Sequence, residues 1–166
     1  AELGIPLTHR GVADSLRFTT GHLREGVALP EDVAARAAAE RTTLAVYMGL
    51  SALPTLVEGL QKHGLSMRTP AAAVERGTTL EQRVVLGEVG ELQERVGAAG
   101  LESPTLIVVG DVVALSPHWE RRNKFPVFEA GDLERSHLNE ALVEPEAVLA
   151  AFENRSPAPP AAKASP

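Results

Sequence analysis

The chain has 166 residues, of which 44% are hydrophobic and 23% are charged, so it is long enough to build one domain with its own core. Its formal net charge of −6 argues against a general nucleic-acid-binding protein, because such proteins carry a basic surface. The absence of cysteine excludes disulfides, thiolate metal sites and cysteine nucleophiles, and it fits a reducing cytoplasm. No apolar run approaches the ~20 residues that would span a membrane.

The N-terminal part predicts one strand and one helix. Residues 15–20 alternate apolar and polar side chains and end at Gly21, which is typical of a strand. Pro30 with two acidic residues after it predicts the start of an alanine-rich helix that reaches about Glu40, because proline and acids are favoured in a first helical turn.

The most informative stretch follows this helix. Residues 44–48 form a short apolar run without alternation, which is typical of a strand covered on both faces, as in a parallel sheet. Gly49 allows a sharp turn, and Ser51 is a natural N-cap for a helix with Pro54 in its first turn. Open α/β sheets bind ligands outside the carboxyl ends of their strands, so we expect this corner to face a ligand.

Helices and strands alternate in the rest of the chain. A helix with Leu53, Leu56, Val57 and Leu60 on one face is expected to end at Gly64, and a second helix to end at Gly100 after Leu92, Val96 and Ala99. Strands are expected at residues 71–74, 83–86 and 105–110, the last of them continuing through residues 111–115. This order predicts a single α/β domain with a mixed sheet flanked by helices.

The chain also divides into regions. It begins without methionine and reads like the middle of a longer protein, so residues 1–14 are interpreted as a linker from a preceding domain. Residues 15–116 form the α/β domain. Residues 117–153 form an irregular or helical extension, with a helix or two expected between residues 133 and 152. Residues 154–166 are rich in proline and alanine and predict a disordered tail.

Classical catalytic motifs are absent from the sequence. The five histidines are scattered without the spacing of metal ligands, so no metal site is expected. No serine lies in a G-x-S-x-G turn, and neither standard glycine-rich phosphate loop is present. These observations alone indicate a soluble α/β domain and leave open whether it binds a ligand.

Three stretches go beyond that, although each has an ordinary structural explanation. Met48, at the end of the apolar run, is either core filling or part of a binding site. The small residues 71–73 before Gly77 permit a close approach to the backbone and a positive φ at the glycine, but they also suit a plain strand and turn. Arg10 could bind a carboxylate through two hydrogen bonds, or it could lie in a solvated loop.

The same stretches occur in a recognisable order. The chain contains GIPLTHRG at residues 4–11, TGH at residues 20–22, TLAVYMGL at residues 43–50, TPAAAVERGTT followed by QRVVLG at residues 69–87, and SPTLIVVGDVVAL at residues 103–115. Together these blocks resemble the C-terminal portion of the tetrapyrrole methylase family. YMGL and VERGT are the most specific of them.

The resemblance implies a fold, an activity and a cofactor. The fold implied is the C-terminal domain of a two-domain enzyme that binds S-adenosylmethionine between its domains and releases S-adenosylhomocysteine. The activity implied is C-methylation of uroporphyrinogen III to precorrin-2, on the way to sirohaem and cobalamin. The cofactor-binding residues implied are Met48 and Gly77, with Tyr47, Gly49 and the backbone of Ala72 and Ala73 beside them.

The resemblance also implies a residue that binds the substrate, a missing N-terminal domain and a homodimeric enzyme. Arg10 is the first candidate for the carboxylates of the tetrapyrrole substrate, followed by Arg17 and Arg76. The N-terminal domain, with its glycine- and proline-rich loop and its acid and base groups, is not in this sequence. We therefore expect no catalytic residue in this chain and no activity from the chain alone, whereas the intact enzyme is expected to be a cytoplasmic homodimer.

Two alternatives remain open at this point. One is a methylase that acts on a later corrin intermediate, and the other is a non-catalytic dimerisation or binding module. GIPLTHRG together with YMGL favours the uroporphyrinogen enzyme over the first alternative.

Overall fold

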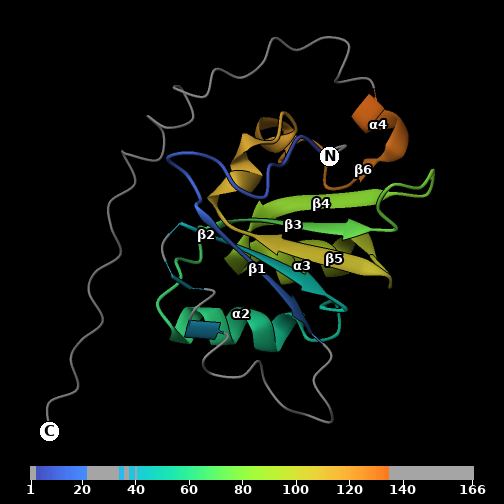
Figure 1. Ribbon diagram of the computed structural model, residues 1–166. Helices are drawn as coiled ribbons and strands as arrows, with labels where there is room; N and C mark the ends of the chain where they lie inside the picture. Colours follow the sequence, from blue (N-terminus) through green and yellow to red (C-terminus); the bar gives the residue numbers. More distant parts are fainter. Residues whose placement is uncertain (1–2, 22–33, 36–37, 40, 135–166) are drawn as a thin grey trace, which may run out of the picture.

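The computed structural model describes residues 3–21, 34–35, 38–39 and 41–134. Within them lies one six-stranded sheet, flanked by helices (Figure 1). Its strands are β1 (Ser15–Thr20), β2 (Thr42–Tyr47), β3 (Pro70–Glu75), β4 (Arg83–Glu88), β5 (Thr105–Val109) and β6 (Phe128–Glu129). The helices are α2 (Leu53–Lys62), α3 (Val89–Ala99), α4 (Ala130–Glu134) and the 3-10 helices η1 (Asp111–Leu115) and η2 (Trp119–Arg121). The expected α/β domain with a mixed sheet is confirmed.

The strand order brings distant parts of the sequence to one edge of the sheet. The order is β1-β2-β5-β3-β4-β6, with β1 parallel to β2 and with β5 antiparallel to both β2 and β3. Because β5 lies between β2 and β3 and opposes both, these two strands point in the same direction. Their carboxyl ends therefore meet at one edge, where β5 begins. This is the edge at which open α/β sheets bind ligands.

Each face of the sheet is covered by a different set of elements. One face packs against α2 and α3 through a large apolar cluster that includes Leu44, Val46, Leu56, Leu60, Leu92 and Ile107. The other face packs against the N-terminal segment, η1 and η2, in an apolar cluster that contains Leu3, Ala72, Val84, Leu86, Val108, Val113, Trp119 and Phe128. Central strands β3 and β5 are therefore buried on both faces, which explains their continuous apolar runs.

The N-terminal segment, interpreted above as a linker, packs against the domain. Leu3, Val12 and Ala13 are buried. The Ser116 hydroxyl donates a hydrogen bond of 2.7 Å to the main-chain oxygen of Leu3. A bridge between His9 and Ala13 closes a turn in the same segment. Residues 3–14 are thus part of the folded unit.

Two local expectations are wrong, and a third feature differs in detail. Ala52 caps α2 without a side-chain hydrogen bond, so Ser51 is not the N-cap, although Pro54 does lie in the first turn. Residues 111–115 form the 3-10 helix η1 instead of extending β5, because Gly110 (φ 142) turns the chain out of the sheet. The chain does turn after β2, and the left-handed residue in that turn is Met48, directly before Gly49.

Some expectations concern residues that the structure does not describe. Most of the helix expected between Pro30 and Glu40 lies outside the described residues, as do almost all of the helices expected between residues 133 and 152. The tail of residues 154–166 lies outside them as well. Within the extension after residue 116, the described elements are η2, β6 and α4.

Candidate functional site

A cavity of about 1250 Å³ opens at the edge where β2 and β3 end. Four parts of the chain line it: the N-terminal segment, the end of β2, the β3–β4 turn and the start of β5. The lining residues are Leu3, Ile5, Leu7, Tyr47, Met48, Ser51, Val74, Arg76, Gly77, Thr78, Thr79, Glu81, Gln82, Ser103, Pro104, Thr105, Leu106 and Val108. Met48 and Gly77, which are 29 positions apart in the sequence, are thus walls of one cavity.

Met48 is not core filling. The residue is 56% exposed, and its backbone has φ 52, in the left-handed region that costs an L-residue about 1–2 kcal/mol. Gly49 follows it and is needed for a different reason: a Cβ there would lie 2.8 Å from Cγ1 of Val46. Gly49 therefore packs closely on β2 directly after the strained residue Met48, whose side chain lines the cavity.

The opposite wall is a second strained turn. Arg76 has φ 45 and Thr78 has φ 68, whereas Gly77 between them is not left-handed, so the expected positive φ at the glycine is wrong. The Gln82 side chain accepts a hydrogen bond of 2.7 Å from the Thr78 amide, and the Thr79 hydroxyl donates one of 2.8 Å to the Arg76 carbonyl. Left-handed non-glycine residues held by surrounding bonds are concentrated at functional sites. Three of the four such residues in the described part of the chain line this cavity.

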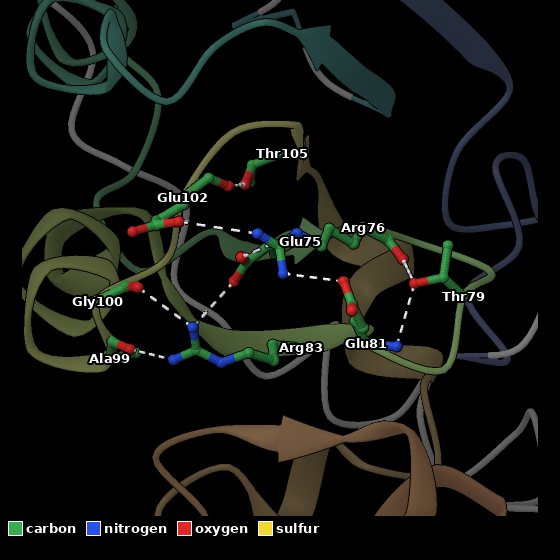
Figure 2. Close-up of polar contacts among 9 residues, drawn as sticks. All are labelled: Glu75, Arg76, Thr79, Glu81, Arg83, Ala99, Gly100, Glu102 and Thr105. Carbon is green, nitrogen blue, oxygen red and sulfur yellow. Dashed lines mark hydrogen bonds and ion pairs between the residues drawn. The ribbon is translucent and has the colours of Figure 1, made fainter.

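The charges around the cavity are balanced. Among its lining residues, only Arg76 and Glu81 are charged at neutral pH, and they form an ion pair of 3.0 Å (Figure 2). Most of the remaining wall is aliphatic, aromatic or hydroxyl-bearing. The cavity therefore suits an amphipathic ligand without a large negative charge.

Apolar side chains also extend from the cavity onto the neighbouring surface. Leu7, Tyr47 and Met48 line the cavity and are all exposed. Phe18, on β1, is exposed beside Tyr47, with the two ring centroids 6.3 Å apart. A cluster of large exposed apolar side chains of this kind marks a surface that binds a ligand or another protein surface.

The other residues expected at the site do not line the cavity. Gly49 lies directly behind Met48, and Ala72 and Ala73 are fully buried in the sheet between β4 and β5. Their small side chains allow both faces of the central strand to be covered, and it is Val74, further along β3, that reaches the cavity. Arg10 is exposed in the turn between His9 and Ala13, and from its segment Leu7 lines the cavity instead.

Several wall residues were not predicted from the sequence. Leu106 and Val108 project from the same face of β5 as Val74 does from β3, since Val74 pairs with Leu106 in the ladder. Their two-residue spacing places them on one face, but the sequence does not show which face is left open. Gln82 gave no signal at all, because its role depends on the turn geometry.

Among the described residues, no group of three or more histidine, aspartate or glutamate side chains is arranged to hold a metal ion. No helix in that part of the chain has both the length and the apolar character needed to cross a membrane.

Comparison with known proteins agrees with this geometry. Residues 1–93 match the family described as Tetrapyrrole (Corrin/Porphyrin) Methylases. The chain is 57% identical over 124 residues to the Arabidopsis thaliana protein named S-adenosyl-L-methionine-dependent uroporphyrinogen III methyltransferase, chloroplastic, an alignment that covers 75% of this chain and 34% of that protein. It is 47% identical over 128 residues to siroheme synthase of Pseudomonas entomophila, covering 76% of this chain and 26% of that protein.

A solved structure shows the same fold. The uroporphyrin-III C-methyl transferase of Thermus thermophilus, complexed with S-adenyl homocysteine, is 33% identical and superposes with a TM-score of 0.55 over 68% of this chain and 48% of that one. Because more than half of the sequence matches the family, this chain belongs to the tetrapyrrole methylases. It spans roughly a third or less of the length of the curated relatives described here.

Proposed function

We propose that this chain forms one wall of the cofactor site of an S-adenosylmethionine-dependent methyltransferase that converts uroporphyrinogen III to precorrin-2. The observation that carries the proposal is the meeting of Met48 and Gly77 in one cavity. Relatives that share up to 57% of aligned residues are named for uroporphyrinogen methylation or sirohaem synthesis, which supports this substrate over a later corrin intermediate.

The cavity fits this cofactor. S-adenosylmethionine combines a flat adenine and a ribose with a positively charged sulfonium, and S-adenosylhomocysteine lacks that charge. The wall is mostly apolar, and the guanidinium of Arg76 is neutralised by Glu81, so nothing here repels a cation. At about 1250 Å³, the cavity is larger than the ~300–1000 Å³ typical of a single ligand, which leaves room for part of a substrate beside the cofactor.

The residues of this chain would bind and orient the cofactor. When bound, S-adenosylmethionine supplies the activated methyl group. Transfer of a methyl group requires alignment of donor and acceptor more than a strong base, and rigid walls provide such alignment. The strained turns at Met48 and Arg76 are held by neighbouring bonds, so the walls are fixed before the ligand arrives. Apolar side chains such as Leu106 and Val108 would exclude water from the site.

The remainder of the enzyme would come from outside this chain. The exposed apolar side chains of Leu7, Phe18, Tyr47 and Met48 provide a surface for a preceding domain to close over the cofactor. That domain would carry the acid and base groups, so this chain alone is expected to lack activity. Arg10, exposed in the turn between His9 and Ala13, stays our candidate for a substrate carboxylate in the closed enzyme.

Two wider features are also proposals. We infer that the intact enzyme is a homodimer, which rests on the family resemblance, and that it works in the cytoplasm, to which the absence of cysteine is suited. Sedimentation of the intact enzyme would test the first proposal, and its localisation in cells the second.

Calorimetric titration of the chain with S-adenosylhomocysteine tests the proposal. We expect saturable binding with a dissociation constant below about 1 mM, equivalent to more than about 4 kcal/mol, because one wall of the site is already formed. Homocysteine alone serves as the control ligand and is expected to give no heat of binding. Absence of binding at millimolar S-adenosylhomocysteine would instead favour a non-catalytic binding module.

A further inference from the structure

A buried carboxylate lies directly behind the cavity turn. Glu75 is the last residue of β3 and is only 1% exposed, and its ladder partner on β4 is Arg83. Nη1 of Arg83 donates to Oε2 of Glu75 over 3.1 Å and to the main-chain oxygen of Gly100 over 3.2 Å, and Nη2 donates to the oxygen of Ala99 (Figure 2). A buried carboxylate is stable only when it is paired and hydrogen-bonded. The pair thereby joins β3, β4 and the end of α3.

A second guanidinium connects this carboxylate to the cavity. Arg76 contacts three carboxylates: Nε lies 3.8 Å from Glu75, Nη1 lies 3.0 Å from Glu81 and Nη2 lies 3.8 Å from Glu102 (Figure 2). Its main-chain amide donates to the oxygen of Pro104 over 3.0 Å. Arg76 is thus held from both sides, by the β3–β4 turn and by the loop before β5.

We propose that Glu75 is a positioning residue for the cofactor site, acting through Arg83 and Arg76 to hold the turn at Gly77 in its strained form. The inference rests on the proposed function, since it assigns Glu75 a role in cofactor binding without contact to the cofactor. Glu75 does not line the cavity, whereas Arg76, Gly77 and Thr78 do. It also means that the guanidinium of Arg76 is occupied by carboxylates of this chain, so that Arg76 does not bind the carboxylates of the substrate.

The turn needs such support because its own geometry is unfavourable. Two residues with side chains, Arg76 and Thr78, are left-handed within three positions, and such backbone persists only where the surroundings determine it. The bonds of Thr78 and Thr79 lie within the turn, and the Arg76 amide bond to Pro104 is a main-chain contact. Two side-chain contacts link the turn to the body of the domain, those of Arg76 with Glu75 and with Glu102, and only the Glu75 carboxylate is buried.

The test compares Glu75→Gln and Glu75→Asp with Glu91→Gln. Glu91 also accepts from an arginine, Arg95, at 2.9 Å, but on the surface of α3 and outside the cavity lining. We expect Glu75→Gln to weaken binding of S-adenosylhomocysteine at least about tenfold in calorimetry, because small displacements of a site cost this much. Glu75→Asp should restore part of the loss, and Glu91→Gln should bind like the wild type. Amide hydrogen exchange at Thr78, whose amide donates to the Gln82 side chain, should be faster in Glu75→Gln than in the control.

The two readouts separate this inference from the proposed function. If the wild type binds and Glu75→Gln binds equally well with unchanged exchange at Thr78, the positioning role is wrong while the function stands. If the wild type does not bind S-adenosylhomocysteine, the proposed function is wrong, and the positioning role is then judged from exchange at Thr78 alone. Faster exchange in Glu75→Gln would support that role, and unchanged exchange would overturn it. Should Glu75→Gln not fold, the double variant Glu75→Met, Arg83→Met leaves no unpaired buried charge and undergoes the same two measurements.

Discussion

Replacement of Gly21 by alanine is expected to destabilise the fold by about 1–3 kcal/mol, as overpacking of a close contact does, and to displace Met48 in the proposed cofactor site. A Cβ at position 21 would lie 2.5 Å from Cα of Gly49 and 2.8 Å from the carbonyl oxygen of Met48. Both are backbone atoms and cannot rotate away, so the ends of β1 and β2 must separate. The hydrogen bond of 2.7 Å from the Gly21 amide to the Tyr47 carbonyl would lengthen, and Met48 would move.

Urea denaturation and titration with S-adenosylhomocysteine measure the two effects of Gly21→Ala. The matched control is Gly97→Ala, because Gly97 lies within α3 and its Cβ would meet nothing within 4 Å. That substitution is expected to leave binding unchanged and to stabilise the protein by up to about 1 kcal/mol, the difference in helix propensity. Equal stability of Gly21→Ala and the wild type would show that the two strand ends do not approach so closely.

Replacement of Met48 by glycine is expected to change stability and binding in different directions. Glycine adopts left-handed backbone without the cost of about 1–2 kcal/mol that methionine has there. It also raises the conformational entropy of the unfolded chain, which opposes this gain. The free energy of unfolding should therefore stay the same or rise by up to about 1 kcal/mol. The loss of the exposed thioether side chain from the cavity wall should weaken S-adenosylhomocysteine binding about tenfold, or 1.4 kcal/mol. Thermal denaturation and calorimetry check the two expectations.

Arg41→Gly is the control for Met48→Gly. Arg41 has φ 57, close to that of Met48, but lies outside this cavity, at the start of β2. It also forms an ion pair of 3.1 Å with Asp14 in which both side chains are more than half exposed, a contact worth at most about 1 kcal/mol. Binding should therefore be unchanged in Arg41→Gly. Tight binding by Met48→Gly would mean that the Met48 side chain is not part of the site.

The strands and helices with clear periodicity were predictable from the sequence. The apolar run of β2 and the i, i+3, i+4, i+7 pattern of α2 reflect burial, which the sequence records directly. The residues that bend the chain were predicted less well. Glycines were expected to supply the left-handed positions, but at the cavity Met48, Arg76 and Thr78 adopt them, because tertiary contacts outweigh local preference there.

The candidate site could be predicted only in part, again because tertiary contacts decide which residues meet. The resemblance pointed to Met48 and Gly77, which line one cavity, and the antiparallel placement of β5 between β2 and β3 explains why they meet. Ala72 and Ala73 were expected near the cofactor because small residues permit close approach, and the structure uses that property to pack the sheet instead. The support from Glu75 depends on pairing across strands, which a single sequence does not reveal.

Titration of the isotope-labelled chain with S-adenosylhomocysteine, followed by nuclear magnetic resonance, tests most directly whether the two strained turns form one cofactor site. The amide signals of Met48 and Gly77 should shift together and saturate with a single dissociation constant, while that of Gly97 stays in place. Saturable binding that moves signals elsewhere and leaves Met48 and Gly77 unaffected would contradict the account.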